Sequence, residues 1–163
     1  MDEGKINGLK EECKQIEQDC LYTAQAHFVL AERYEKRMRR YIIWPAAAAA
    51  VFSLVSTIWP DKLGPAGYVA TLLSGLAAIS AGLGMERAVS AHKQAANLLT
   101  ALRHEARRLH ETWSTDLTPE QFAQEVRQLC ERYDSYVVAL EVTDKKAFEE
   151  ARKLIKDGVF DPD

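Results

Sequence analysis

The stretch "LRHEARRLH" gathers histidine, glutamate and arginine, the side chains that most often bind metals or move protons. In the helix of a zinc protease, two histidines four residues apart share one face and bind the metal. Here His104 and His110 are six residues apart, so on a helix they point in different directions. The sequence therefore predicts no metal site here, and no cofactor.

Three arginines of the same stretch, Arg103, Arg107 and Arg108, carry planar guanidinium groups that can grip a phosphate. Glu105 and Glu111 lie close by in sequence, and salt bridges on an exposed helical face are the stronger explanation of the arginines. The chain has no Gly-rich phosphate loop of the GxxxxGK[ST] or GxGxxG type. Phosphate binding is therefore kept as the second interpretation of these arginines.

The other histidines and the cysteines fit a packed interior. His27 and His92 fall on apolar stripes, which favours hydrogen-bonded core histidines, with a pH-sensing role as the alternative.

Cys13 and Cys20 share one helical stripe, and with Cys130 they form an odd set without CxxC spacing. We expect neither a disulfide framework nor a zinc ribbon, and a reducing cytoplasm suits these thiols. No nucleophile, base and orienting group come together, so we expect no enzyme.

Helical periodicity organises most of the chain. Apolar residues recur every three or four positions from Ile6 to Tyr41 and again from Met85 to Trp113. Thr118 with Pro119 and Gln121 has the pattern of a capping box at a helix start. Thr143 is expected to cap a last helix, which Gly158 ends. We predict an all-helical fold, with an N-terminal amphipathic helix over 4–40, helices over 86–158 and a tail over 159–163.

Two central stretches, 41–59 and 63–85, carry no charge. As helices they measure roughly 28 Å and 34 Å, against a bilayer core of about 30 Å. Residues 60–62 are the predicted connector. Pro60 is expected to end one helix, and Pro65 is expected to begin the next. The predicted unit is a two-helix transmembrane hairpin, and the alternative is the buried helix pair of a soluble bundle.

The flanking residues favour the membrane. Basic residues precede the first stretch and follow the second, and aromatic rings mark both edges (Lys36, Arg37, Arg39, Arg40, Arg87 and Lys93; Tyr41, Trp44 and Trp59). By the positive-inside rule, both termini and the helical bundle face the cytoplasm of a bacterial inner membrane. The first forty residues are densely charged, so we expect no signal peptide there. A net charge of -3 and a pI of about 5.8 argue against duplex nucleic acid as a partner.

Small side chains lie on one face of each stretch and would let helix backbones approach closely in lipid. The predicted packing face of the second stretch comprises Ala66, Ala70, Ser74, Ala78 and Gly82. If several hairpins assemble, the candidate pore-lining residues are Ser53, Thr57, Thr71, Ser74 and Ser80. The opposite side of the second stretch, with Tyr68, Leu72, Leu76, Ile79 and Leu83, suits lipid.

The order of these segments, with "AHKQAANLLTALRHEARRL", "LTPEQFAQEVRQLCERYDSYV" and "FEEARKLIKDG", resembles the SLATT family over nearly the whole chain. This family comprises two-transmembrane effector domains of bacterial nucleotide-signalling conflict systems. The resemblance implies a homo-oligomer that permeabilises the inner membrane in anti-phage defence by abortive infection. It also implies a trigger, either a cyclic nucleotide or a sensor protein of the same system. A non-conducting membrane anchor, whose cytoplasmic bundle docks partner proteins, is the alternative function.

Overall fold

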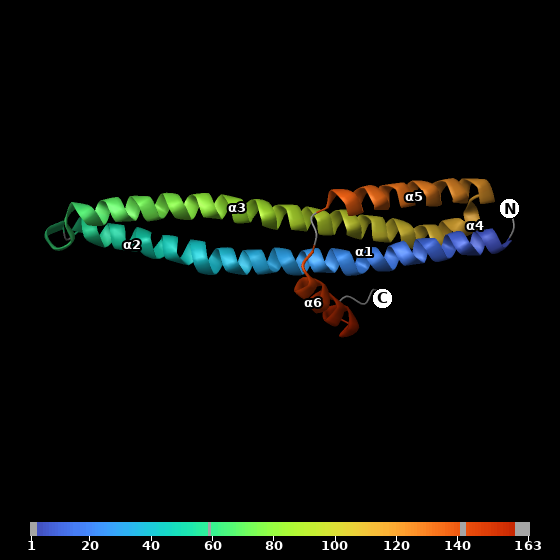
Figure 1. The fold of residues 1–163 in the computed structure, drawn as a ribbon, viewed down its shortest axis with the longest axis horizontal. Helices are drawn as coiled ribbons and strands as arrows, with labels where there is room; N and C mark the ends of the chain where they lie inside the picture. Colours follow the sequence, from blue (N-terminus) through green and yellow to red (C-terminus); the bar gives the residue numbers. More distant parts are fainter. Residues whose placement is uncertain (1–2, 59, 141–142, 159–163) are drawn as a thin grey trace. The chain divides into compact units, whose positions relative to one another are not determined.

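The computed structural model describes residues 3–58, 60–140 and 143–158, and for 52–58, 60–71, 73–74, 77–78 and 80–81 it describes the backbone alone. Every regular element in this part of the chain is helical. The elements are α1 (Glu3–Met38), η1 (Arg39–Ile43), α2 (Trp44–Ile58), α3 (Pro60–Arg108), η2 (Leu109–Trp113), α4 (Ser114–Asp116), α5 (Pro119–Ala139) and α6 (Lys145–Lys156), of which η1 and η2 are π-helical (Figure 1). The predicted all-α class is confirmed.

The chain divides into two compact units. The first comprises Met1–Leu30 and His92–Asp163, and the second comprises Ala31–Ala91. In the first unit, the N-terminal part of α1 lies beside the C-terminal part of α3, with α5 packed along them (Figure 1). In the second unit, α2 lies beside the beginning of α3.

The core of the first unit is built from the apolar stripes of three helices. The stripe of α1 supplies Cys13, Ile16, Cys20 and Ala24; α3 and η2 supply Leu99, Leu102, Ala106 and Leu109; and α5 supplies Phe122, Val126 and Leu129. Each of these side chains is buried. The three-and-four spacing predicted this arrangement, because only residues at that spacing share one helical face. Trp113, at the end of the α3 stripe, departs from it and is 38% exposed.

The helix α5 begins as the sequence predicts. The Thr118 side chain accepts a hydrogen bond from the Gln121 backbone N–H, and the Gln121 side chain accepts one from the Thr118 N–H, with Pro119 at the first helical position. These bonds satisfy donors that a helix start otherwise leaves without partners.

The predicted cap of the last helix was wrong by one residue. Asp144, not Thr143, caps α6, and its carboxylate accepts from the Ala147 N–H at 2.5 Å. A carboxylate is favoured over a hydroxyl here because it also interacts with the helix dipole. Gly158 follows the helix end with φ 73°, the left-handed conformation that glycine adopts without strain.

The predicted break near Trp44 is a π-helical turn. In η1 the Trp44 N–H donates to the Arg39 carbonyl, five residues back, and α2 then begins with Trp44 and Pro45. Proline fits this first turn because the missing N–H would have no helical partner there. The chain thus passes from α1 into α2 without a loop.

The helix bounds around the predicted connector differ from those that the sequence suggested. Pro60 begins α3 instead of ending a helix, and α3 continues through Pro65 and across 85–86 to Arg108. Pro60 fits the first helical position, where a proline is tolerated, whereas Pro65 lies beyond the first turn of α3 and has no N–H to donate to the carbonyl four residues back. At 85–86 only the composition changes, since Glu86 and Arg87 are themselves good helix formers. Trp59 lies outside the described residues.

Among the residues that the structure describes, no helix combines the length and the apolar composition that a bilayer crossing requires.

Candidate functional site

An exposed row of large aliphatic side chains runs along α3 in the second unit. Leu72, Leu76, Ile79 and Leu83 are 70%, 65%, 63% and 55% exposed. Their spacing of four, three and four residues places them on one helical face. We call these four residues the α3 apolar row; they belong to the face that the sequence assigned to lipid.

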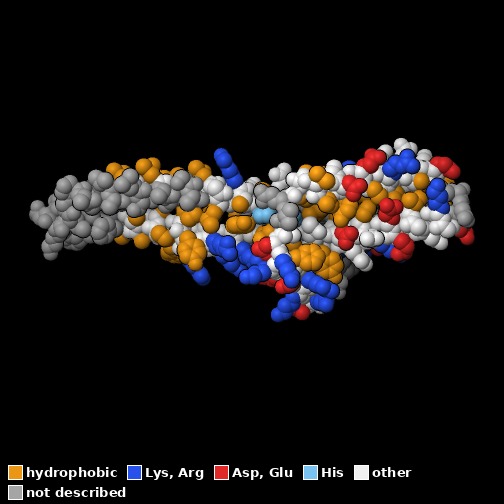
Figure 2. Space-filling view, in the orientation of Figure 1, with side chains coloured by type: hydrophobic (Ala, Val, Ile, Leu, Met, Phe, Trp, Pro, Cys, Tyr) orange, Lys and Arg blue, Asp and Glu red, His pale blue; other side chains and the backbone are white. Residues whose placement is uncertain are grey.

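Apolar side chains are also exposed on η1 and α2 of the same unit. Tyr41, Trp44 and Val51 are each more than half exposed, and Ile43 nearly half. Figure 2 shows such side chains, in orange, at the surface of this unit. Exposed large apolar side chains in such number mark a site for a membrane, a partner or a ligand.

Gly82 of α3 lies next to the Ile42 side chain of η1. A Cβ added at Gly82 would lie 3.5 Å from the Ile42 Cγ2 atom, which is an ordinary van der Waals contact. Gly82 is the member of the predicted packing face whose surroundings are described. The side chains of Ala66, Ala70, Ser74 and Ala78 lie outside the described residues, as do those of the pore-lining candidates Ser53, Thr57, Thr71 and Ser80.

Basic side chains flank the apolar surface of the second unit. Arg37, Arg39, Arg40 and Arg87 are exposed to solvent. Lys36 forms an exposed ion pair with Glu32 at 2.6 Å between Nζ and Oε1. An exposed pair of this type contributes little to stability. These basic side chains can therefore interact with anionic groups outside the protein.

The three candidate phosphate-binding arginines, in the first unit, have different neighbours. Arg107 binds Glu111, with 3.0 Å between Nε and Oε2, as the salt-bridge interpretation expects. Arg108 donates to the His104 carbonyl and lies 5.7 Å from the ring centre of Trp113. The Nε of Arg103 is buried without a hydrogen-bond partner. Nothing in these contacts brings the three guanidinium groups to one point.

Two buried histidines meet where α1 and α3 pack in the first unit. The Nδ1 atoms of His27 and His92 are 3.0 Å apart, and the residues are 1% and 4% exposed. The predicted hydrogen-bonded core histidines are confirmed. That they bond to each other was not predicted; the clue was that both lie on the apolar stripes of neighbouring helices.

His104 and His110 have separate surroundings. His110 Nε2 lies 2.7 Å from Glu17 Oε2 on α1, whereas His104 is exposed. In the part of the chain that the structure describes, no three side chains of metal-binding type come together. The sequence missed the His110–Glu17 contact because the partners are far apart in sequence.

The three cysteines are free thiols in the first unit. Burial raises the pKa of Cys13 and of Cys20 to about 12, and burial together with the Glu12 carboxylate raises that of Cys130 to about 11. Thiols with such values stay protonated and react slowly at neutral pH. The prediction that Cys13 and Cys20 are packing residues is confirmed, since both are fully buried.

No family model, no curated protein and no solved structure matches this chain.

Proposed function

We propose that the protein is an oligomeric membrane effector of the SLATT type. In this proposal the helices over 41–85 insert into the bacterial inner membrane as a hairpin, and several hairpins together permeabilise it. The observation that carries the proposal is the α3 apolar row, four large aliphatic side chains exposed on one face of one helix.

The free energy of transfer from water favours burial of the α3 apolar row. Removing a Leu or Ile side chain from water gains about 1.5 to 3 kcal/mol. The row therefore favours an apolar surrounding by several kcal/mol, which acyl chains supply along its whole length. The uncharged sequences of 41–59 and 63–85 and the basic residues around them support this orientation.

Permeabilisation requires more than one copy, because a single hairpin cannot enclose water. The small residues of the predicted packing face, among them Gly82 beside the Ile42 side chain, suit helix association in lipid. No charged residue lies within either stretch beyond the connector, so we expect a weakly selective pathway. The trigger would be a nucleotide signal or a sensor protein, as for the family it resembles.

The test is dye leakage from liposomes reconstituted with the full chain. Leu76→Asp places a charge in the proposed lipid-facing row, at a cost of about 3 kcal/mol in mid-membrane. We expect it to abolish membrane insertion and leakage. Val138→Asp is the matched control, because Val138 is 86% exposed but lies on α5 of the first unit. It should leave both unchanged.

The outcomes separate the candidate functions. Insertion with leakage that Leu76→Asp removes supports the effector. Insertion without leakage, under all candidate triggers, supports the alternative of a membrane anchor. Recovery of the wild-type chain from the soluble fraction as a detergent-free monomer would refute both.

A further inference from the structure

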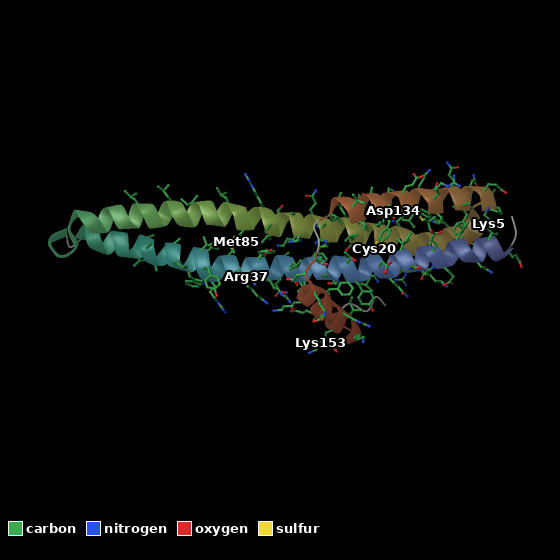
Figure 3. The ribbon with its side chains drawn as sticks, viewed as in Figure 1. Lys5, Cys20, Arg37, Met85, Asp134 and Lys153 are labelled. Atoms are coloured by element: carbon green, nitrogen blue, oxygen red, sulfur yellow. The ribbon has the colours of Figure 1, made fainter. Side chains whose placement is uncertain are left out.

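A cavity lies between α1 and α5 in the first unit. It has a volume of about 280 Å³ and opens to solvent. It is lined by Lys5, Leu9 and Glu12 of α1 and by Ala123, Val126, Arg127 and Cys130 of α5. Figures 1 and 3 show α5 running beside the start of α1, where Lys5 is labelled.

The spacing explains why these side chains share one cavity. Residues 5, 9 and 12 fall on one face of α1, and residues 123, 126, 127 and 130 fall on one face of α5. Val126 is fully buried in the core, while Leu9 and Ala123 are half-buried beside it. The floor of the cavity is therefore apolar, and its charged groups stand on the walls.

The charges on the walls are unequal. Within the described part of the chain, neither Lys5 nor Arg127 has a hydrogen bond or an ion pair in the structure. The single carboxylate, that of Glu12, accepts a hydrogen bond from the Cys130 Sγ at 3.5 Å. Two cations thus face the cavity without an acidic partner, one of them an arginine that can bind a carboxylate through two parallel bonds.

We propose that this cavity binds a small organic monocarboxylate with a short apolar body. Arg127 holds the carboxylate through its guanidinium fork and Lys5 adds a second charge, while the apolar body covers Leu9, Ala123 and Val126. The volume is slightly below the usual range for drug-sized ligands, which selects a body of on the order of ten non-hydrogen atoms.

Cys130 supplies a built-in reporter, because a ligand on the cavity floor covers its thiol. Cys13 and Cys20 are fully buried and do not compete for reagent. The experiment follows alkylation of Cys130 by N-ethylmaleimide at pH 8.5 in the full chain, with mass spectrometry to assign the modified residue. The probe is 3-phenylpropionate, and its amide is the uncharged control.

We expect saturable protection of Cys130 by 3-phenylpropionate, half-maximal below about 1 mM, and at least about tenfold weaker protection by the amide. Arg127→Gln should raise the half-protecting concentration of the carboxylate by about tenfold, and Lys5→Gln should raise it by less. Glu12→Gln should lower it, because the substitution removes the charge that repels a carboxylate. Arg152→Gln, an exposed arginine on α6 outside the cavity, is the matched control and should change nothing.

Equal protection by the acid and the amide would overturn the proposal, as would unchanged protection in Arg127→Gln. The opposite signs for Arg127→Gln and Glu12→Gln exclude a general effect on folding, since loss of structure would weaken binding in both. The thermal midpoint gives a second readout, because a ligand of the folded state raises it in wild type and not in Arg127→Gln.

Discussion

At the scale of single residues, the buried thiols make stability depend on alkaline pH. The pKa of Cys13 and of Cys20 is about 12 in the folded chain, against 9.0 for an exposed thiol, because burial penalises the thiolate. The folded state holds these protons more tightly than the unfolded chain. The stability that these two thiols contribute to the folded state is therefore fully present below pH 9 and is lost as pH rises from 9 toward 12.

The measurement is the free energy of unfolding as a function of pH, for wild type and for Cys13→Ala/Cys20→Ala. Each thiol should contribute a slope of about 1.4 kcal/mol per pH unit above pH 9. The double variant should be less stable at pH 8, where packing is lost, but should decline less steeply above pH 9. Identical slopes for wild type and the double variant would show that unfolding releases no protons from these two thiols.

The histidine pair predicts a coupling that neither residue shows alone. His27→Leu deprives the buried Nδ1 of His92 of its His27 partner, which should cost about 1 to 3 kcal/mol of unfolding free energy. His92→Leu should cost a similar amount for the same reason. The double variant, with two apolar residues in contact, should cost less than the sum of the two, by about 0.5 kcal/mol or more. Strict additivity in a denaturant titration would contradict direct contact.

At the scale of elements, the capping box of α5 is a local device with a measurable value. Thr118→Ala removes the acceptor of the Gln121 N–H and should lower the unfolding free energy by about 1 kcal/mol. Thr118→Ser keeps the hydroxyl and should retain most of that stability. A loss as large for Ser as for Ala would mean that the threonine methyl group, and not the cap, carries the effect.

Some features of the helices could be predicted from the sequence, and others could not. The stripes of α1, α3 and α5 were predictable, because burial follows helical period, and the cap at Thr118 was predictable because both partners lie within four residues. The continuation of α3 through Pro65 was not predictable, since a proline beyond the first turn of a helix usually interrupts it. The cavity at Lys5 and Arg127 escaped notice because the pairing of one helical face with another is a tertiary property.

At the scale of the whole molecule, most of the exposed large apolar side chains that the structure describes lie in the second unit, although Val137 and Val138 of α5 are exposed in the first. The second exposes the α3 apolar row and the aromatic rings at 41 and 44, whereas ion pairs link the helices of the first, such as Arg132 of α5 with Glu105 of α3 at 2.8 Å. The proposed membrane effector needs such a difference between its units, since one part would enter lipid and the other would stay in water. The tryptophans Trp44 and Trp113 lie one in each unit.

Quenching by brominated lipids tests this segregation directly. The variants Trp59→Phe/Trp113→Phe and Trp44→Phe/Trp59→Phe each retain a single tryptophan. In the first of these variants, Trp44 should be quenched strongly by lipids brominated near the headgroup and less by those brominated near the chain end. That order follows from the preference of indole for the membrane interface. Trp113, 38% exposed in the first unit, should be quenched by neither lipid and should instead be accessible to aqueous iodide. Equal lipid quenching of the two tryptophans, or none at Trp44, would place the second unit outside the bilayer and remove the basis of the proposed permeabilisation.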